Sequence, residues 1–364
     1  MSYDVAIVGG GPAGLAVALE AVLRGFSAAV FERRRGPVDK ACGEGLMPAG
    51  IRSLERLGVM ALMDRDEMAP FETISYIQED GRAAVGRLPG TGGFGIRRVA
   101  LARAMTRRAR EVGVALHEHC AVRSHRVDGC GVTLETDAGS VRAKLLVAAD
   151  GLHSPLRRAE GLDRRPTGPL RFGLRRHASI APWSASVEVH FAPDAEAYVT
   201  PAGRHRVGIA FLWEHGRLDS SVSFDTILAR FPVLQARLAN APWDSSPRGA
   251  GPLRQSCSTR TKDRFVLAGD AGGYLDAITG EGLSLAFDGA AALAEVLPDA
   301  LALGATQSSL LPYELAMERL FRKHARLASL LVSIARRPRL RRFVVDRLMA
   351  RPGLFDWILG RALA

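Results

Sequence analysis

A glycine-rich turn close to the N-terminus constrains the fold of this chain more than any other feature. Asp4–Val8 has the composition of a buried strand, the run Gly9–Gly14 (GGGPAG) follows it, and Pro12–Leu23 has the apolar spacing of a helix. In such a strand–turn–helix unit, Gly9 permits the tight turn, Gly11 lets the backbone approach a pyrophosphate, and Gly14 lets the helix pack closely on the strand. The helix N-terminus adds free N–H groups and a positive dipole end. We therefore predict a Rossmann βαβ unit that binds a dinucleotide.

An acidic residue at the end of the next strand completes this unit. Ser27–Phe31 has the pattern of a second parallel strand, and Glu32 closes it. A carboxylate at this place can accept hydrogen bonds from the ribose hydroxyls of a bound dinucleotide. The unit does not by itself distinguish NAD from FAD.

A second motif near residue 270 makes that distinction. The strand-like Phe265–Ala268 runs into Gly269-Asp270, and the turn Gly280-Glu281-Gly282 precedes a predicted helix. This arrangement resembles the flavoproteins that share the para-hydroxybenzoate hydroxylase fold. The resemblance implies that Asp270 binds the ribityl chain of FAD and that the Gly280–Leu283 turn directs N–H groups at the N1/O2 edge of the flavin. A helix dipole there would stabilise the anionic reduced flavin.

A third motif resembles another fingerprint of the same family. Asp150-Gly151 is followed by Ser154 and Arg157, and Arg98 opens a predicted helix over Leu101–Glu111. The resemblance implies contacts of Asp150-Gly151 with the pyrophosphate side of FAD and with NAD(P)H, and of Arg98 with the FAD phosphates. The cofactor-binding residues that we expect are Gly9, Gly11, Pro12, Ala13, Gly14, Glu32, Arg33, Cys42, Gly43, Arg98, Asp150, Gly151, Asp270, Gly280, Glu281, Gly282 and Leu283.

The segment Lys40–Pro48 indicates a branch of the family. Its Cys-Gly-Glu-Gly-Leu run resembles the Cys-Gly-x-Gly-Leu segment of the geranylgeranyl reductase-like flavoproteins, in which the cysteine lies close to the isoalloxazine. Cys42 would then tune the flavin, contact the substrate or donate a proton. The alternative is a small residue in a tight loop against the ring, with Gly43 allowing close backbone approach.

Three segments of the middle region favour a different branch. Phe172–His177, Val187–Phe191 and Ala197–Pro201 resemble stretches of FAD-dependent monooxygenases, some of which are associated with phenolic lipids made by type III polyketide synthases. A phenol requires a base or polar relay, which His177, His190 and Tyr198 could supply, although a structural role is the alternative for each. The Trp-x-Trp-x-Ile-Pro segment of flavin-dependent halogenases is absent. The candidate catalytic residues are Cys42, His177, His190 and Tyr198.

The order of the predicted elements gives the domain organisation. Val114–His117, Ala121–Val127 and Val132–Thr136 read as a small β-meander, and Leu145–Ala149 as a strand that returns to the parallel sheet. Alternating patterns dominate residues 166–261. We therefore expect an α/β fold with a Rossmann-like FAD-binding domain (1–70, 95–165 and 262–300), an inserted antiparallel β-sheet substrate domain (71–94 and 166–261) and C-terminal helices (301–364).

Composition limits the partners. The formal net charge is +11, but the basic residues are spread along the chain without a recognisable nucleic-acid-binding module, so we expect no nucleic-acid partner. Four cysteines without CxxC spacing do not predict a disulfide framework or a zinc site. Because Tyr3–Val8 already has the pattern of a strand, we expect no leader before it and a cytoplasmic protein. The region Arg319–Arg361 alternates apolar and basic residues, so its helices either pack over the substrate domain or contact an anionic membrane surface.

We expect an FAD-dependent oxidoreductase, and first of all an NAD(P)H-dependent monooxygenase that uses O2 on a hydrophobic aromatic or polyketide-like molecule of secondary metabolism. The nicotinamide cofactor would bind transiently, since no second Rossmann fingerprint is present to hold it. The first alternative is a geranylgeranyl reductase-like enzyme that saturates prenyl or other alkenes. A more distant alternative is a non-catalytic binding protein of the same fold.

Overall fold

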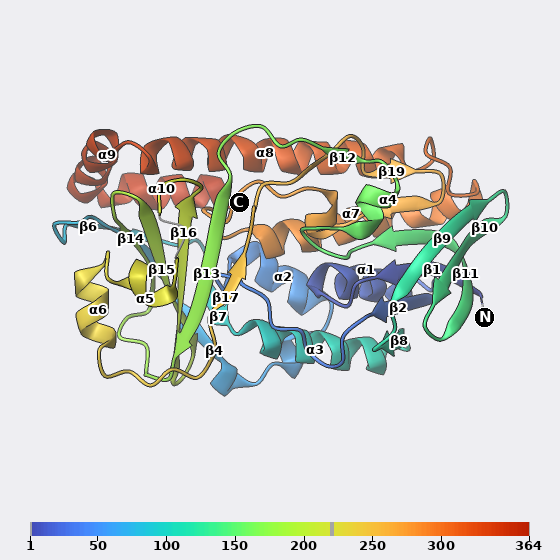
Figure 1. Cartoon of the computed structure of the whole chain (residues 1–364), viewed down its shortest axis with the longest axis horizontal. Helices are drawn as coiled ribbons and strands as arrows, with labels where there is room; N and C mark the ends of the chain where they lie inside the picture. Colours follow the sequence, from blue (N-terminus) through green and yellow to red (C-terminus); the bar gives the residue numbers. More distant parts are fainter. Residues whose placement is uncertain (1, 219–221, 364) are drawn as a thin grey trace.

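The computed structural model describes residues 2–218 and 222–363, and two sheets dominate it. In Figure 1 the main sheet lies at the end that carries the N-terminus, the second sheet lies at the opposite end, and helix α8 (Leu311–Ala335) runs along the molecule between the two ends. The α/β class expected from the sequence is confirmed. The exact domain boundaries stay a prediction.

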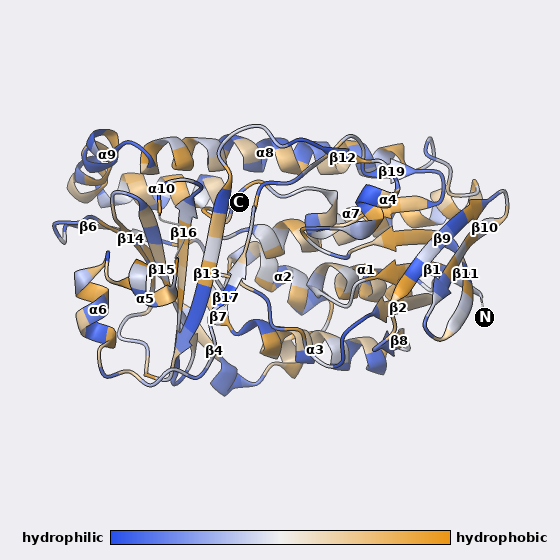
Figure 2. Ribbon diagram, viewed as in Figure 1, coloured by the Kyte–Doolittle hydropathy of each residue, from blue (hydrophilic) through white to orange (hydrophobic). Residues whose placement is uncertain are grey.

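The main sheet is built around the predicted βαβ unit. Its strand order is β19-β20-β11-β1-β2-β8, with β10 and β9 attached to β11, and β1 is parallel to both β2 and β11. Figure 2 shows that its central strands are strongly hydrophobic, as expected for strands covered on both faces. The strands are β1 (Ser2–Val8), β2 (Ala28–Glu32), β8 (Ala115–Glu118), β9 (Val122–Asp128), β10 (Gly131–Thr136), β11 (Gly139–Ala148), β19 (Thr261–Lys262) and β20 (Phe265–Leu267).

The prediction that residues 114–117 belong to the meander is wrong. Strand β8 instead pairs in parallel with β2, where Ala29 lies opposite Ala115. The preceding helix α3 (Arg98–Glu111) carries the chain back along the sheet, and a strand that follows such a crossover adds in parallel rather than as a hairpin. Strands β9, β10 and β11 alone form the antiparallel meander.

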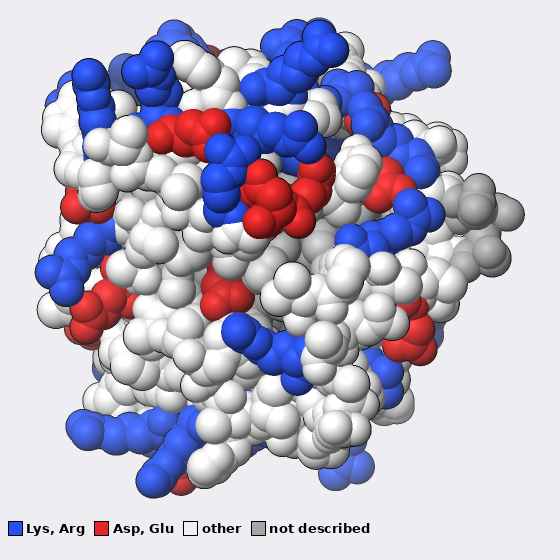
Figure 3. All heavy atoms as spheres, turned by 90° about the vertical axis from the view of Figure 1, so that its left-hand side faces the viewer, with Lys and Arg blue, Asp and Glu red and all other residues white. Residues whose placement is uncertain are grey.

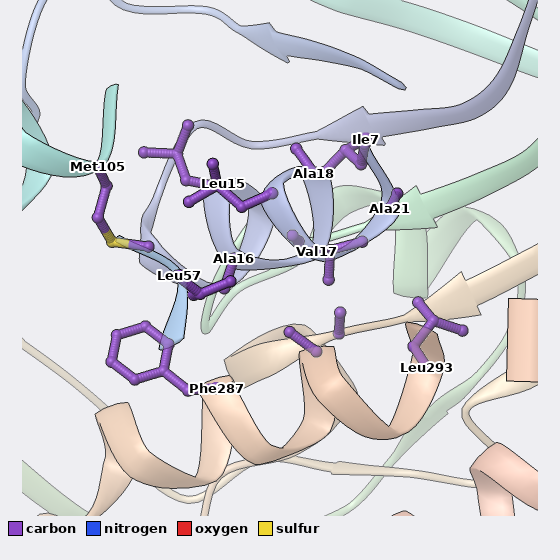
Figure 4. Close-up of a cluster of buried hydrophobic side chains, with 14 of the residues drawn as sticks. Ile7, Leu15, Ala16, Val17, Ala18, Ala21, Leu57, Met105, Phe287 and Leu293 are labelled. Atoms are coloured by element: carbon purple, nitrogen blue, oxygen red, sulfur yellow. The ribbon is translucent and has the colours of Figure 1, made fainter. Parts of the chain in front are cut away.

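A buried hydrophobic cluster joins α1 (Pro12–Leu23) to α7 (Gly282–Ala302). Leu15, Val17, Phe287 and Leu293 belong to it and are at most 2% exposed, and Figure 4 shows side chains of α1 and α7 directed toward one another. Because α7 comes from the far end of the sequence, this packing fixes the turn before α7 relative to the glycine turn before α1.

The second sheet combines two distant segments of the chain. Its order is β17-β13-β16-β15-β14-β5-β6, and the sheet is mixed rather than fully antiparallel, because β5 pairs in parallel with β14. No hairpin joins these two strands, so antiparallel pairing is not imposed on them. The strands are β5 (Thr73–Ile77), β6 (Ala83–Arg87), β13 (Arg171–Ala178), β14 (Ser186–Phe191), β15 (Ala195–Gly203), β16 (Arg206–Glu214) and β17 (Arg248–Ala250).

Each face of the second sheet has its own core. One face packs against α5 (Phe224–Leu228) and α6 (Pro232–Leu238), and the other lies against two loops of the main domain and the C-terminal helices. None of the helices in the described residues is both long and apolar enough to cross a membrane. The remaining elements are α2 (Pro48–Arg56), α4 (Pro155–Ala159), α9 (Pro338–Ala350), α10 (Pro352–Leu363), β3 (Gly45–Leu46), β4 (Met68–Phe71), β7 (Gly93–Ile96), β12 (Asp163–Arg164), β18 (Ser256–Cys257), η1 (Met60–Leu62), η2 (Arg65–Glu67) and η3 (Gly269–Gly272).

Candidate cofactor and substrate site

The glycine turn has the geometry that phosphate binding requires. Gly9 adopts φ +112°, and a Cβ atom there would lie 2.3 Å from the carbonyl oxygen of Ala149. A Cβ on Gly14 would lie 2.0 Å from the carbonyl oxygen of Gly9, so both positions need glycine. A Cβ on Gly11 would meet nothing within 4 Å. The first turn of α1, with Pro12 at its start, therefore faces open space.

Glu32 lies directly beside this turn. Its Oε2 atom accepts the N–H group of Gly10 at 2.8 Å, and its Oε1 atom accepts that of Arg34 at 3.0 Å. Gly10 and Glu32 also line a pocket with Ala102 and Thr106 of α3. The acid is thus held at the end of β2, at the place where a ribose would lie, while the neighbouring Arg33 is exposed.

The Asp270 turn meets the first turn. Gly269 adopts φ +58°, and a Cβ there would lie 2.5 Å from the Cβ of Ala13. Burial raises the pKa of Asp270, and the positive charges of Arg98 and Lys40 oppose that shift. The buried Nη1 atom of Arg98 has no hydrogen-bond partner in the described structure. A cationic group left unpaired beside the turn of α1 fits an anionic ligand group.

Asp150 and Gly151 close the same region from a third side. Asp150 Oδ2 accepts the N–H group of Leu156 at 3.1 Å, whereas its buried Oδ1 has no partner among the described residues. Arg157 is 1% exposed and donates to the carbonyl oxygens of Ala271 at 2.9 Å and Leu152 at 3.2 Å. It therefore braces the Asp150 loop against the Asp270 turn.

These observations test whether the residues fit FAD. The glycine contacts bring together three motifs that are widely separated in the sequence, namely the turn at Gly9, the loop after Ala149 and the turn at Gly269. Open space beside Gly11 and two unpaired buried polar atoms, Arg98 Nη1 and Asp150 Oδ1, lie at this meeting point. The residues fit a dinucleotide with a pyrophosphate. Among the described residues, no cluster of His, Cys, Asp and Glu could hold a metal ion.

The predicted flavin turn lies next to the cysteine segment. Gly280 adopts φ +67°, and a Cβ there would lie 3.2 Å from Cε of Met47. The sulfur of Cys42 accepts the N–H group of Glu44 at 3.4 Å, and Gly43 has no atom within 4 Å of a hypothetical Cβ. Burial raises the pKa of the Cys42 thiol, so the thiol is neutral at neutral pH.

His177 is part of a buried ionic network. Its Nε2 atom lies 2.6 Å from Oε2 of Glu44, and its Nδ1 atom lies 3.1 Å from Nη1 of Arg175. Glu44 Oε1 accepts the backbone N–H group of Arg98 at 2.9 Å, at the start of α3. Glu44 thus connects His177 to the backbone N–H group of Arg98, a geometry in which His177 would position Arg98 rather than touch a substrate. Sequence reasoning missed Glu44, although an acid between two glycines in the cysteine segment was the available signal.

Tyr198 belongs to a second polar cluster. Its hydroxyl donates to Glu196 Oε2 at 3.0 Å, and Arg171 donates to the same oxygen at 2.6 Å. Arg171 also donates to Asp276 Oδ1 at 3.0 Å, which ties the sheet to the loop before the flavin turn. Burial raises the pKa of Tyr198 well above its usual range. Sequence reasoning missed Arg171, Glu196 and Asp276, because residues of three separate segments meet only in the folded chain.

An apolar surface surrounds the Tyr198 cluster. Tyr76, Phe191 and Tyr198 of the sheet pack in one cluster with Met47 and Ile278, which come from the two loops beside the flavin turn. Aromatic side chains next to one buried ion pair suit a hydrophobic ligand that carries a polar group.

His190 does not join this surface. It lies opposite Ala197 across strands β14 and β15, whereas Val189 lies opposite Tyr198, so the pleat places His190 on the other face of the sheet. There its Nε2 atom lies 2.9 Å from Oε2 of Glu188. The structure therefore brings Cys42, His177 and Tyr198 to one side of the sheet and separates His190 from them.

Comparison with known proteins gives a family match over most of the chain. A family model for the FAD binding domain matches residues 2–327. The chain is 28% identical over 307 residues to dialkyldecalin synthase of Streptomyces rugosporus, covering 80% of this chain and 64% of the synthase. It is 26% identical to digeranylgeranylglycerophospholipid reductase of Methanoculleus marisnigri, covering 86% of this chain and 81% of the reductase.

The chain is shorter than some of these relatives. It spans less than two thirds of the synthase, and 61% of conditioned medium factor receptor 1 of Dictyostelium discoideum, to which it is 25% identical over 79% of its own length. Among solved structures, p-nitrophenol 4-monooxygenase of Pseudomonas putida superposes with a TM-score of 0.82 at 21% identity, covering 98% of this chain and 97% of the other. At that identity the likeness concerns the fold.

Proposed function

Because the chain belongs to the FAD-binding domain family, we propose that it is an FAD-dependent monooxygenase that hydroxylates a hydrophobic aromatic or polyketide-like molecule with NAD(P)H and O2. The observation that carries the substrate class is the apolar cluster of Tyr76, Phe191, Met47 and Ile278 around the hydroxyl of Tyr198. The likeness in fold to p-nitrophenol 4-monooxygenase supports an aromatic substrate.

The residues that would hold FAD follow from the geometry of the turns. The N-terminus of α1 and the unpaired Arg98 would bind the pyrophosphate, and Glu32 would bind the ribose of the adenosine half. Asp270 would bind the ribityl chain, and the N-terminus of α7 would receive the pyrimidine edge of the flavin. Bound FAD supplies the redox chemistry, accepting hydride from NAD(P)H and, once reduced, activating O2.

The chain's own residues orient the substrate and exclude water. The aromatic and aliphatic side chains around Tyr198 would bind the apolar body of the substrate and keep water from the reacting atoms. The hydroxyl oxygen of Tyr198 would accept a hydrogen bond from a substrate phenol, while Glu196 Oε2 holds the Tyr198 proton. The Arg171–Asp276 contact would hold the Tyr198 cluster at a fixed position relative to the loop before the flavin turn.

Substrate-triggered oxygen uptake tests this assignment. Purified protein loaded with FAD would be given NADPH or NADH and a series of phenols with increasing alkyl chains. We expect oxygen consumption that rises with the phenol and a product one oxygen atom heavier by mass spectrometry. Flavin reduction without oxygen transfer to any phenol, together with anaerobic saturation of a prenyl chain, would contradict hydroxylation.

The neutral thiol of Cys42 favours the second candidate, an alkene reductase. In that reaction bound FAD would supply the hydride, and Cys42 Sγ would donate the proton to the other carbon of the double bond. A raised pKa for this thiol keeps the proton available at neutral pH. The similarity to digeranylgeranylglycerophospholipid reductase supports this alternative. Anaerobic incubation with dithionite and a prenyl lipid, with mass gains of two hydrogens per double bond, decides between the two.

A lipid surface is part of the proposed function, as the source of the hydrophobic substrate. Helices α9 and α10 expose Phe343 (55%) and Trp357 (63%), and on the end of the molecule where these helices lie Figure 3 shows many Lys and Arg side chains, together with several Asp and Glu clusters, around uncharged surface. Arginines without an acidic partner in the described structure accompany them: Arg339, Arg347, Arg351 and Arg361. Exposed aromatic residues among these arginines, of which Arg347 lies 5.1 Å over the ring of Phe343, suit the interface of an anionic bilayer.

Flotation with lipid vesicles tests this contact. We expect the protein to float with vesicles rich in phosphatidylglycerol and to stay behind with neutral phosphatidylcholine. The double change Phe343→Ser and Trp357→Ser should abolish flotation, whereas Leu303→Ser, an equally exposed site at the end of α7, should leave it unchanged. Equal flotation of wild type and the double variant would refute the surface.

A further inference from the structure

A carboxyl group and an imidazole meet directly under the predicted flavin turn. Glu281 is the N-cap residue of α7, and its Oε2 atom lies 3.3 Å from Nδ1 of His324 on α8. The Nε2 atom of His324 lies 3.2 Å from Oγ1 of Thr279, which precedes Gly280. Helix α8 therefore contacts both sides of the turn through one histidine, and no step of the proposed oxygen or alkene chemistry uses this pair.

We propose that Glu281, held by His324, is a protonation switch that sets the reduction potential of the flavin bound at the N-terminus of α7. This inference rests on the proposed function, because it requires the flavin to lie at that turn. Glu281 would not touch the substrate. It is a positioning residue that acts through the charge at one end of the helix.

The protonation state of the pair follows from its surroundings. Both side chains are nearly buried, with 12% exposure for Glu281 and 13% for His324. Burial raises the pKa of Glu281 to about 7, an effect that Asp288 increases and Lys323 opposes. Burial and the charge of Lys323 lower the pKa of His324. Glu281 is therefore protonated below about pH 7 and ionised above it, while the lowered pKa of His324 keeps the imidazole beside it neutral at neutral pH.

Other charged groups face the pair from the neighbouring elements. Asp288 lies two turns further along α7. Burial raises its pKa, and the positive charges of Arg52 and Arg56 on α2 and of Lys323 oppose that shift. Asp270 of η3 lines the same pocket as His324. Burial raises the pKa of Asp270 too, so an ionised carboxylate is disfavoured throughout this buried region.

The charge of Glu281 would oppose reduction of the flavin. An ionised carboxylate at the N-cap offsets the positive end of the α7 dipole, which would otherwise stabilise the reduced anion. Reduction of the oxidised flavin to its anionic form takes up two electrons and one proton. When Glu281 is already ionised, the negative charge of the reduced flavin raises the pKa of the Glu281 carboxylate. Reduction is then accompanied by uptake of a second proton, at Glu281. Above its pKa, the potential should therefore fall more steeply with pH.

The midpoint potential of the holoprotein as a function of pH tests the switch. It would be measured spectroelectrochemically with reference dyes from about pH 5.5 to 9 for wild type, Glu281→Gln and Glu295→Gln. The last variant removes an exposed carboxylate from the C-terminal half of α7, away from the flavin turn, and serves as the matched control. Above pH 7, the midpoint potential of wild type should fall by about 30 mV more per pH unit than that of Glu281→Gln. For a two-electron reduction, this difference is a tenfold change in the equilibrium constant per pH unit.

Two further measurements sharpen the test. His324→Leu removes the polar group in contact with the protonated carboxyl group, so the steeper region should begin at lower pH. Proton uptake by wild type during reduction near pH 8 should exceed one proton per two electrons, and this measurement needs no variant. Parallel potential profiles for wild type and Glu281→Gln, with FAD bound to both, would overturn the switch and leave the proposed function standing. A wild-type protein that binds no FAD would overturn the proposed function itself.

Discussion

Arg98 offers a sharp test of the cofactor site, because its loss should weaken ligand binding without weakening the fold. The Nη1 atom of this side chain is buried and has no partner in the described structure, and Lys40 lies close enough for the two positive charges to repel. In the apoprotein, Arg98→Met removes both the repulsion from Lys40 and the attraction to Asp270, so the stability of the apoprotein should change little. A hydrogen bond to a charged group contributes about 1.5–3 kcal/mol, so losing the contact with the FAD phosphates should weaken FAD binding by about 10- to 150-fold.

The assay compares two properties of the same variants. Quenching of flavin fluorescence during titration of apoprotein gives the dissociation constant, and thermal unfolding of the apoprotein gives its stability. Arg103→Met is the matched control, since Arg103 lies on the same helix and pairs with Glu67 at the surface. We expect the control to bind FAD like wild type. An Arg98→Met protein that binds FAD within threefold of wild type, or that binds weakly only because its apoprotein unfolds, would refute the reasoning.

Three other predictions follow from the buried polar groups. Glu44→Gln weakens the charge-assisted contacts with His177 and with the N–H group of Arg98, so the free energy of unfolding should fall by about 1.5–3 kcal/mol in urea titrations, and an unchanged value would contradict the network. Because the folded pKa of Glu281 lies near 7, above its unfolded value, stability should be lost as pH rises from about 4.5 to 7, by about 3 kcal/mol from this group. Glu281→Gln should remove that loss, and an identical pH profile would contradict the assignment. Tyr198→Phe should lower substrate-triggered oxygen uptake at least about tenfold while reducing stability by only about 1 kcal/mol, and full activity would exclude Tyr198 from the site.

The parts of the fold that local patterns determine could be predicted from the sequence. The helix over Pro12–Leu23 was predicted with its observed bounds, because glycines and a proline mark its start and its apolar spacing is regular. The start of α7 near Gly282 was predicted as well, but its end was not. These elements carry their own start signals, so no tertiary information was needed.

Pairing partners were harder to predict, since they depend on contacts between distant segments. Strand β8 was assigned to the meander because it precedes two β-rich runs, but the crossover through α3 places it beside β2. The parallel pairing of β5 with β14 had no signal in either strand. The face on which a side chain lies depends on this register, which is why His190 was grouped with Tyr198 in the prediction and is separated from it in the structure.

The candidate site shows the same division. Motif residues such as Gly9, Glu32 and Asp270 could be found because their spacing reflects a local turn. The acids and bases that hold the motifs together could not, because Glu44, Arg171 and Asp276 acquire partners only when three segments fold onto each other. Buried ionic contacts of this kind leave little trace in one sequence, since each residue taken alone looks like an ordinary surface charge.

The central claim is that the turns at Gly9, Asp150 and Asp270 together bind one FAD molecule. Titration of the purified apoprotein with FAD, followed by removal of free flavin and measurement of bound absorbance per chain, tests it most directly. The account predicts saturation at one FAD per chain, with flavin fluorescence quenched up to that point. A protein that stays colourless and leaves the fluorescence of added FAD unchanged would contradict it.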